Sequence, residues 1–259
     1  MTKDPDTLFK AATLLIVRDG AQGLEVLMVE RHANIGFAGG ALVWPGGRID
    51  PADYDAGWQE VALGLDPEDD ADAQAARIAA VREAFEECGI LIATRGGAPI
   101  GAFAATLTHA RQSVDRDATL FLPLMREHGL TLRPDQLVPF ARWIPPPASH
   151  KRFDTRFFLT RLPEGQVALQ DGNEAVDTIW IRPRDALDQL KAGTRKIIFP
   201  TARNLELLAL SGSVQHAFSD LARRKQGIVQ PVIDGDRLTI RTDLGYPVTE
   251  ESIATAMRG

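Results

Sequence analysis

A stretch of helical periodicity, from about residue 69 to residue 88, constrains this chain more than any other feature. At about 100° per residue, its apolar side chains fall within one arc roughly 80° wide. Glu83, Glu86 and Glu87 fall within an arc of similar width, centred on the opposite side. The apolar arc contains Ile78, Val81, Phe85 and Cys88. The pattern therefore predicts one helix that buries an apolar stripe and presents three carboxylates on its other face.

Three carboxylates at this spacing repel one another and raise one another's pKa unless positive charge lies among them. A hard divalent cation suits carboxylate oxygens, and Mg²⁺ typically completes its octahedron with substrate phosphates and water. Mn²⁺ favours the same oxygen ligands. The alternative is a solvated acidic face, which is the usual explanation for clustered glutamates. The helix alone leaves both interpretations open.

The segment before the helix favours the metal site. An apolar run, residues 24–30, has the alternation of a strand. A glycine-rich loop follows and ends in Pro45-Gly46-Gly47, where the backbone can turn sharply and approach a ligand closely. A carbonyl of this loop can join the helix carboxylates on a metal ion.

Together these segments resemble the Nudix box, in which Gly, five residues, Glu and seven residues precede Arg-Glu-apolar-any-Glu-Glu-any-Gly-apolar. The second half is matched by Arg82 to Ile90, with Ala84 in the slot where a bulkier apolar residue is more usual. Gly47 resembles the opening glycine, but it lies 35 positions before Arg82, where an uninterrupted box needs 14. About 21 residues, roughly 50–72, are therefore inserted. Counting back from Arg82 places Gln74 at the early glutamate position, which in the family is not usually a primary metal ligand.

The insertion narrows the resemblance to a long-box branch of the Nudix superfamily, whose described members hydrolyse coenzyme A (CoA) and acyl-CoA. The resemblance covers roughly residues 10–210, and a shorter CoA signature known from other Nudix enzymes fits only in part. The segments that match the branch are Leu27 to Arg31, Phe37 to Gly40, Trp44 to Gly47, Asp50 to Asp53 and Arg152 to Phe158.

This resemblance implies an α/β/α sandwich with a mixed central sheet, an insertion within the box and helical additions. It implies hydrolysis that depends on Mg²⁺ or Mn²⁺ and splits CoA or acyl-CoA into 3′,5′-ADP and (acyl-)phosphopantetheine. The nearest alternative is the same chemistry on ADP-ribose or on a dinucleotide such as NADH. A non-hydrolytic nucleotide sensor is a further alternative, against which the three intact carboxylates argue.

The resemblance also implies the roles of the site residues. The metal ligands are the Gly46 carbonyl, Glu83, Glu86 and Glu87. Arg82 orients one of these carboxylates through a charge-assisted hydrogen bond, so Arg82 and Glu86 are expected to serve catalysis. A general base must reach the attacking water. In the family it often comes from a late loop, and Glu174 is the candidate here, with a solvated loop glutamate as the alternative.

Substrate contacts are expected from three arginines and two aromatic residues. Arg31, Arg152 and Arg156 are candidates for binding phosphates, including the 3′-phosphate of CoA, because arginine makes bidentate phosphate contacts. Phe37 and Trp44 are candidates for stacking on adenine. The alternatives are that Arg156 pairs with Asp154 or a carboxylate at the sheet edge, and that the loop aromatics anchor their loop to the core.

The remaining pattern predicts one domain with additions. Residues 1–210 are expected to form the Nudix domain, with insertions at about 50–72 and 100–150, and residues 211–259 to form a helix and β-hairpin extension packed on it. Strands are predicted at residues 11–18, 24–30, 137–144, 152–162 and 176–181, and helices at 115–127, 184–191 and 202–225. Asp234-Gly235 predicts a hairpin near the C-terminus.

Composition favours a cytoplasmic enzyme that binds a small molecule. Hydrophobic residues make up 44% of the 259 residues, yet no apolar run approaches the roughly 18 residues of a membrane span, and the N-terminus lacks the layout of a signal peptide. Cys88 is the single cysteine, and its place on the apolar stripe indicates a core residue. A net charge of −6 argues against general nucleic-acid binding. The five histidines form no spaced cluster, which argues against zinc. Whether the chain forms a homodimer stays open.

Overall fold

A mixed β-sheet forms the centre of the molecule. The computed structural model describes residues 8–32, 39–66, 68–147, 152–169 and 175–256. Eight strands form the sheet in the order β10-β2-β1-β9-β8-β11, with β3 paired to β2 and β4 paired to β1. β1 pairs with β9 and β8 with β11 in parallel, and the other pairs are antiparallel. The strands are β1 (Leu8–Gly20), β2 (Gly23–Arg31), β3 (Leu42–Val43), β4 (Gly46–Arg48), β8 (Val138–Trp143), β9 (Arg152–Arg161), β10 (Ala175–Ile181) and β11 (Ile228–Val229).

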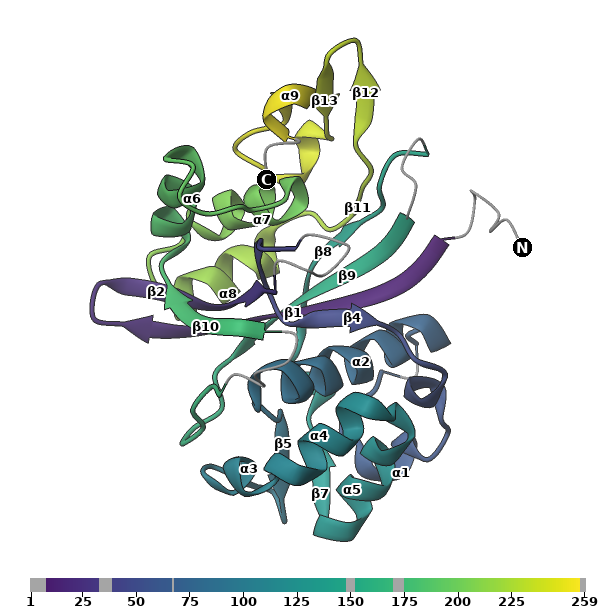
Figure 1. Cartoon of the computed structure of the whole chain (residues 1–259). Helices are drawn as coiled ribbons and strands as arrows, with labels where there is room; N and C mark the ends of the chain where they lie inside the picture. The colour runs from purple at the N-terminus through teal and green to yellow at the C-terminus, as the bar shows by residue number, and fades with distance from the viewer. Residues whose placement is uncertain (1–7, 33–38, 67, 148–151, 170–174, 257–259) are drawn as a thin grey trace.

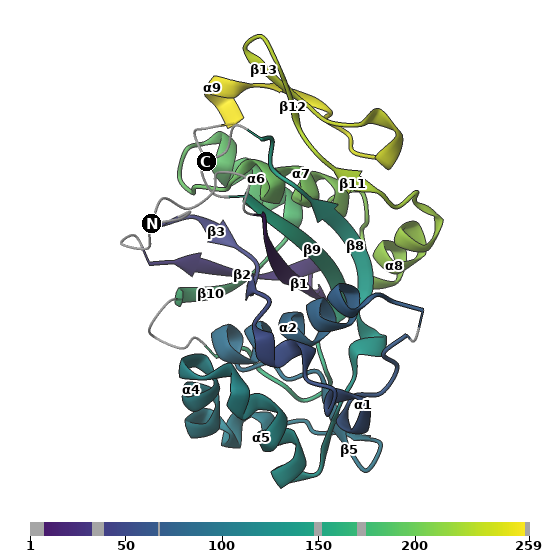
Figure 2. The same ribbon diagram turned by 90° about the vertical axis from the view of Figure 1, so that its right-hand side faces the viewer.

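Helices cover both faces of this sheet, as Figures 1 and 2 show. Helix α2 (Ala71–Cys88) lies on one face, and α6 (Pro183–Lys191), α7 (Phe199–Leu208) and α8 (Val214–Arg223) lie on the other. Successive side chains of a strand point to opposite faces. Leu14 and Ile16 of β1 accordingly belong to the core on the α2 face, and Leu15 and Val17 to the core on the other face. The predicted α/β/α sandwich is confirmed.

Helix α2 has clear start and stop signals. The Asp70 side chain caps it by accepting a hydrogen bond from the Ala73 amide at 2.6 Å. Gly89 ends it in the left-handed region, at φ 68°, which glycine adopts without steric cost. Small buried residues let this helix approach the sheet closely, namely Ala75, Ala76, Ala79, Ala80 and Ala84. The bounds agree with the predicted helix at about residues 69–88.

Two insertions pack together beside α2. The first contains the 3₁₀ helix η1 (Pro51–Tyr54) and α1 (Trp58–Val61). The second contains β5 (Ala93–Arg95), β6 (Ala98–Pro99), α3 (Phe103–Thr106), α4 (Thr108–Arg116), η2 (Ala118–Leu120), α5 (Phe121–His128), β7 (Leu130–Leu132) and η3 (Pro134–Gln136). The Trp58 ring lies 5.3 Å from that of Phe121, which lies 6.0 Å from that of Phe85 in α2. The single helix predicted at residues 115–127 is wrong, because Asp117 has an extended backbone and caps η2 with its side chain.

The C-terminal part continues from α8 into a small antiparallel sheet. The helix predicted at residues 202–225 is two helices, because Ser213 caps α8 through the His216 amide at 3.2 Å. The predicted hairpin is present, with its turn at Gly235-Asp236. Its elements are β12 (Val232–Asp234), β13 (Arg237–Thr239), η4 (Thr242–Leu244), β14 (Glu250–Ser252) and α9 (Ile253–Ala256). Among the described residues, no helix is long and apolar enough to cross a membrane.

Candidate active site

A buried ion pair joins α2 to η1. Arg82 and Asp53 are only 4% and 3% exposed. Arg82 Nε donates to Asp53 Oδ1 at 2.9 Å, and Arg82 Nη2 donates to Asp53 Oδ2 at 3.0 Å. The Asp50 amide donates to Asp53 Oδ2 at 2.8 Å, which holds the carboxylate in place. This fork-to-fork arrangement fixes the direction of the guanidinium as well as its position.

The other nitrogens of the guanidinium hold the helix glutamates and the glycine loop. Arg82 Nη1 donates to both carboxylate oxygens of Glu86 at 3.0 Å and lies 3.0 Å from Glu83 Oε1. Arg82 Nη2 also donates to the Arg48 carbonyl at 3.0 Å. One side chain therefore ties together η1, the end of β4 and two carboxylates of α2. This is the geometry that the expected orienting role of Arg82 requires.

Strand β4 brings its glycines against the same carboxylates. The Gly46 amide donates to Glu87 Oε2 at 3.3 Å. A Cβ atom at Gly47 would lie 2.4 Å from Glu83 Oε1, so no larger residue fits there without displacing Glu83. The structure thus brings Gly46, Glu83, Glu86 and Glu87 together, although the contact that it shows is the Gly46 amide and not its carbonyl.

Burial and neighbouring charges shift the pKa values of Asp53, Arg82 and Glu86. Burial, together with the neighbouring carboxylates of Glu83 and Asp115, raises the pKa of Glu86 to about 8, while Arg82 opposes the shift. Burial also raises the pKa of Asp53 above its usual value, against the lowering effect of Arg82. Burial alone would lower the pKa of Arg82, but Asp53, Glu83 and Glu86 raise it, so the guanidinium stays charged.

The donor set suits a hard divalent cation. Carboxylate oxygens are the ligands that Mg²⁺ and Mn²⁺ prefer, and a cation here would relieve the crowding that raises the pKa of Glu86. In the described part of the chain, no three His, Cys, Asp or Glu side chains converge closely enough to hold a metal as they stand. Both Glu86 oxygens face Arg82. Binding would therefore require the Glu86 carboxylate to turn part of the way from Arg82 to the cation.

Helix α4 of the second insertion also reaches the site. Arg111 Nε donates to the backbone carbonyl of Glu86 at 2.8 Å, and the Arg111 side chain is buried. Asp115, one turn further along α4, is the residue whose charge adds to the raised pKa of Glu86. Nothing in the sequence pattern pointed to Arg111 or Asp115, because both come from an insertion without a recognisable motif.

Two of the expected substrate residues can be placed near the glycine loop. Arg31 ends β2, whose Glu30 pairs with Leu42 of β3. Trp44 is 3% exposed and packs edge-to-face against Phe157 at 6.2 Å between ring centroids. This burial favours the alternative that Trp44 anchors its loop to the core, and its stacking on adenine stays a prediction. Phe37 and Glu174 lie outside the described residues.

The other two arginines lie elsewhere, on β9. Arg156 lies 3.5 Å from Asp70, the capping residue of α2, and Asp154 pairs with Arg142. The expected pairing of Arg156 with Asp154 is therefore wrong. Arg152 Nη2 donates to the Pro145 carbonyl at 3.4 Å. In the sheet, Ala12 of β1 stands between Arg156 and Gly47, so Arg156 lies two strands away from the glycine of the site.

Asp53 also changes how the sequence is aligned with the Nudix box. Counted forward from Gly47, five residues lead to Asp53, so the box has its early acid and the insertion lies in the spacer behind it. Gln74 accepts a hydrogen bond from Gln59 and donates to the carbonyls of Asp66 and Asp69, away from Arg82. The placement of Gln74 at the early acid position is therefore wrong. Counting from the glycine end as well as from Arg82 would have found Asp53.

Comparisons with known proteins show what this chain is similar to. The family model described as the NUDT19 Nudix domain matches residues 66–207. A protein of Xenopus laevis named acyl-coenzyme A diphosphatase NUDT19 is 28% identical over an alignment 227 residues long, which covers 72% of this chain and 59% of that protein. Its Homo sapiens counterpart is 31% identical over an alignment 209 residues long, which covers 65% of this chain and 56% of that protein. The chain thus spans less than two thirds of these relatives.

One solved structure is matched by this chain over nearly its whole length. The crystal structure of a NUDIX hydrolase from Alicyclobacillus acidocaldarius is 30% identical to this chain, with a TM-score of 0.72. The match covers 82% of this chain and 96% of that one. The sheet and its flanking helices are therefore shared with that hydrolase almost throughout.

Proposed function

This chain belongs to the Nudix hydrolase family, and we propose that it cleaves the diphosphate linkage of CoA or acyl-CoA with the help of Mg²⁺ or Mn²⁺. Water would add to one phosphorus as the bridging P–O bond breaks, giving 3′,5′-ADP and (acyl-)phosphopantetheine. The names of the Xenopus laevis and Homo sapiens relatives support the choice of substrate. The family supports the metal requirement.

One observation carries the proposal: Arg82 gathers Glu83, Glu86 and the end of β4 around a single buried guanidinium. A sensor that only binds nucleotides has no need to hold these carboxylates in one fixed cluster. Such a cluster is costly, because burial and mutual repulsion both disfavour the charged forms. A phosphate-bound divalent cation offsets both effects, which favours the hydrolase over the sensor.

Each residue of the cluster has a distinct task in this proposal. Glu83, Glu86 and Glu87 would hold the cation, and the cation would neutralise the diphosphate and lower the pKa of bound water. Arg82 would fix the direction of the Glu86 carboxylate, and Asp53 would fix the direction of Arg82. Gly47 would leave room for Glu83 beside β4. Glu174 is kept as the proposed general base, and Arg31 as a proposed phosphate ligand.

The test is product analysis with the full chain on a panel of diphosphates. The panel contains CoA, several acyl-CoAs, dephospho-CoA, ADP-ribose and NADH, each with Mg²⁺, with Mn²⁺ and with excess EDTA. We expect 3′,5′-ADP from CoA thioesters, much less turnover of dephospho-CoA and none with EDTA. Cleavage of ADP-ribose or NADH without cleavage of CoA would keep the Nudix chemistry and overturn the substrate.

Two variants make the panel specific to the site. Glu86→Gln is expected to lose turnover of every substrate, since the amide cannot replace a carboxylate on the cation. Glu60→Gln removes the same charge from an exposed residue of α1 whose side chain pairs, among the described residues, with Arg126, and it should turn over like the wild type. Full metal-dependent activity of Glu86→Gln would overturn the mechanism. If the wild type turned over no substrate of the panel, the result would favour a nucleotide sensor that does not hydrolyse its ligand.

A further inference from the structure

Two arginines lie directly opposite each other in the central sheet. Arg142 of β8 is the cross-strand partner of Arg156 of β9 in an antiparallel pair. Side chains at such positions point to the same face, with Cβ atoms roughly 5 Å apart. Like charges in this relation destabilise a sheet unless negative charge lies between them. The positive charge of this pair must therefore be balanced by negative groups nearby.

The protein neutralises one of the two arginines well. Arg142 donates to both oxygens of Asp154, at 2.7 and 2.5 Å. Among the described residues, Arg156 forms an ion pair with Asp70, whose Oδ1 is 3.5 Å away and already accepts the capping hydrogen bond from Ala73. The charge of Asp72 also acts on Arg156, without a hydrogen bond between them among the described residues. Within the described residues, Arg156 donates no hydrogen bond that meets normal geometry, although its side chain is only 22% exposed. Its donors are thus available to a ligand.

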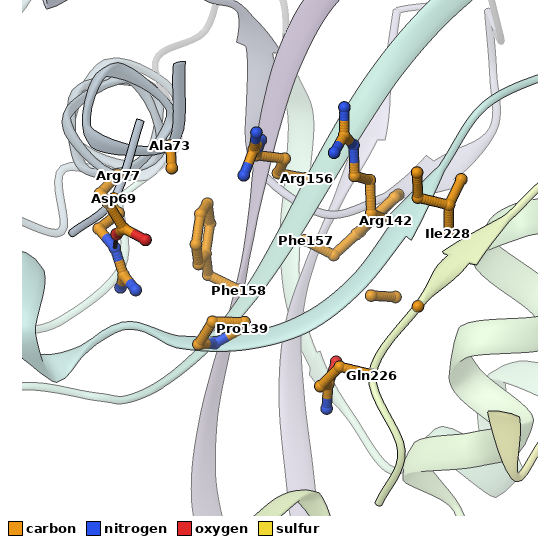
Figure 3. A pocket seen from close by; sticks show the side chains of 12 residues that line it. Asp69, Ala73, Arg77, Pro139, Arg142, Arg156, Phe157, Phe158, Gln226 and Ile228 are labelled. Carbon is orange, nitrogen blue, oxygen red and sulfur yellow. Dashed lines mark hydrogen bonds and ion pairs between the residues drawn. The ribbon is translucent and has the colours of Figure 1, made fainter. Parts of the chain in front are cut away.

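The two guanidinium groups open into a groove of about 330 Å³. Figure 3 shows Arg156 between β9 and Ala73 of α2, with the Phe158 ring beside it. Pro139 and Ile228 give the groove further apolar surface, and Arg77 lies across it with its guanidinium 5.3 Å from the centroid of the Phe158 ring. The volume lies at the lower end of the range typical of small-molecule sites.

This groove is separate from the candidate active site. Its residues on α2 end at Arg77, and the first carboxylate of the cluster, Glu83, comes six residues later, about 9 Å along the axis. In the sheet, Ala12 stands between Arg156 and Gly47 in the row that crosses β9, β1 and β4. Ala12 is completely buried beneath α2, so the two regions are not joined across that row.

We propose that this groove is a second ligand site, which binds a phosphate monoester carried on a small apolar or aromatic group. A phosphate accepts several hydrogen bonds from neighbouring guanidinium forks, and it would accept from the Arg156 donors, to which Asp70 offers no hydrogen bond of normal geometry. The Asp69 carboxylate also lines the groove, and it is paired with Arg77 at 3.2 Å. Phe158, Pro139 and Ile228 provide the apolar contact for the attached group. The site goes beyond the proposed hydrolysis and does not depend on it.

The test is calorimetric titration of the full chain with phenyl phosphate, in EDTA so that no metal occupies the glutamate cluster. Phenol and inorganic phosphate, titrated in the same way, separate the apolar and the anionic contributions. We expect phenyl phosphate to bind at least about tenfold more tightly than either fragment. Arg156→Gln should weaken binding by about tenfold or more, because a hydrogen bond to a charged group is lost.

Matched variants locate the site. Arg182→Gln removes the same charge from an exposed arginine that pairs with Asp185 outside the groove, and it should bind like the wild type. Arg142→Gln combined with Asp154→Asn keeps the net charge and removes one guanidinium from the groove, so it should also weaken binding, and it decides the matter if Arg156→Gln does not fold. Absence of binding by the wild type, or equal binding by Arg156→Gln and Arg182→Gln, would overturn the proposal.

Discussion

Asp53 and Arg82 show how much of a site can depend on one residue that contacts no substrate. Their ion pair is buried on both sides, and Arg82 is the residue that holds Glu86. Removing one member of a buried pair leaves an uncompensated charge, which is far more costly than losing an exposed pair. The position of Glu86 therefore depends on a residue 33 positions earlier in the chain.

We expect Asp53→Asn to lower both stability and activity. The free energy of unfolding should fall by about 3 kcal/mol, because Arg82 loses its charged partner. kcat should fall by roughly tenfold to a hundredfold, as for other residues that orient metal ligands, with little change in KM. Urea unfolding and steady-state turnover of the preferred substrate measure the two effects.

Asp55→Asn is the matched control for that variant. Asp55 lies two residues away and is exposed. In the described part of the chain its side chain accepts a hydrogen bond from the Gly57 amide, which an asparagine can also do. It should leave stability and kcat unchanged. If Asp53→Asn behaved like Asp55→Asn, Asp53 would have no part in positioning Arg82.

Gln74→Glu is expected to change kcat by less than about twofold, as surface substitutions usually do. Gln74 precedes Arg82 by eight residues of helix, about 12 Å along the axis, and its side chain contacts the first insertion. The carboxylate would therefore not reach Arg82. Turnover of this variant in the Asp53→Asn background is the measurement, and rescue there would show that Gln74 does occupy the early acid position.

The sequence predicted the helix carboxylates and the glycine loop correctly, because periodicity and spacing are local properties. It did not predict Asp53 as the partner of Arg82, because the insertion hides the spacing when it is counted from one end only. The sequence likewise did not predict that Trp44 is buried, since an aromatic residue in a loop can face either the core or a ligand. That choice depends on Phe157, which lies on a distant strand.

At the level of elements, Glu206 on α7 makes stability depend on pH. Its Oε1 accepts a hydrogen bond from Arg203 Nη2 at 2.7 Å, and its buried Oε2 has no hydrogen-bond partner among the described residues. Burial raises the pKa of Glu206 to about 7, with Arg203 opposing and Glu251 adding to the shift. The folded protein thus holds this proton more tightly than the unfolded chain does.

We therefore expect the free energy of unfolding to fall as pH rises from about 4.5 to about 7. In this window the folded state is protonated at Glu206 and the unfolded state is not, so raising the pH favours unfolding. The contribution should be about 1–2 kcal/mol after allowance for solvent screening. Urea unfolding of the wild type and of Glu206→Gln, measured from pH 4.5 to pH 7, isolates the contribution of Glu206. Identical pH profiles of the two proteins would contradict this role of Glu206.

Element boundaries show where sequence periodicity fails. The predicted helices at residues 115–127 and 202–225 are each interrupted, at Asp117 and at Ser213. Both residues cap the helix that follows, and apolar residues continue at helical spacing across the break. A capping side chain inside a periodic stretch signals a new helix only if the backbone is extended there, which depends on tertiary packing.

On the scale of the whole molecule, a buried polar cluster ties the C-terminal part to the sheet and α7. Tyr246 donates to Asn204 Oδ1 at 2.8 Å, and Trp143 Nε1 lies 3.2 Å from both Asn204 Oδ1 and the Tyr246 hydroxyl. Burial raises the pKa of Tyr246 to about 12, so the hydroxyl stays protonated and can donate. The extension is therefore joined to the domain through specific hydrogen bonds as well as apolar contacts.

Tyr246→Phe should lower the free energy of unfolding by about 1–2 kcal/mol, because Asn204 Oδ1 loses the nearer of its two buried hydrogen-bond donors, Tyr246 and Trp143. Turnover should be unchanged, since the cluster lies on the face of the sheet opposite α2. Urea unfolding and limited proteolysis measure the loosening of the C-terminal part. Loss of kcat with unchanged stability would contradict this separation.

The two insertions bury each other's apolar surface. Trp58 of the first packs on Phe121 of the second, the Leu63 amide donates to the Leu132 carbonyl at 2.9 Å, and Arg126 pairs with Glu60 at 2.7 Å. A chain without the second insertion would expose Trp58, and a chain without the first would uncover Phe121. Deleting either segment alone is therefore expected to cost more stability than the loss of that segment's own contacts, because an aromatic side chain of the other segment would become exposed.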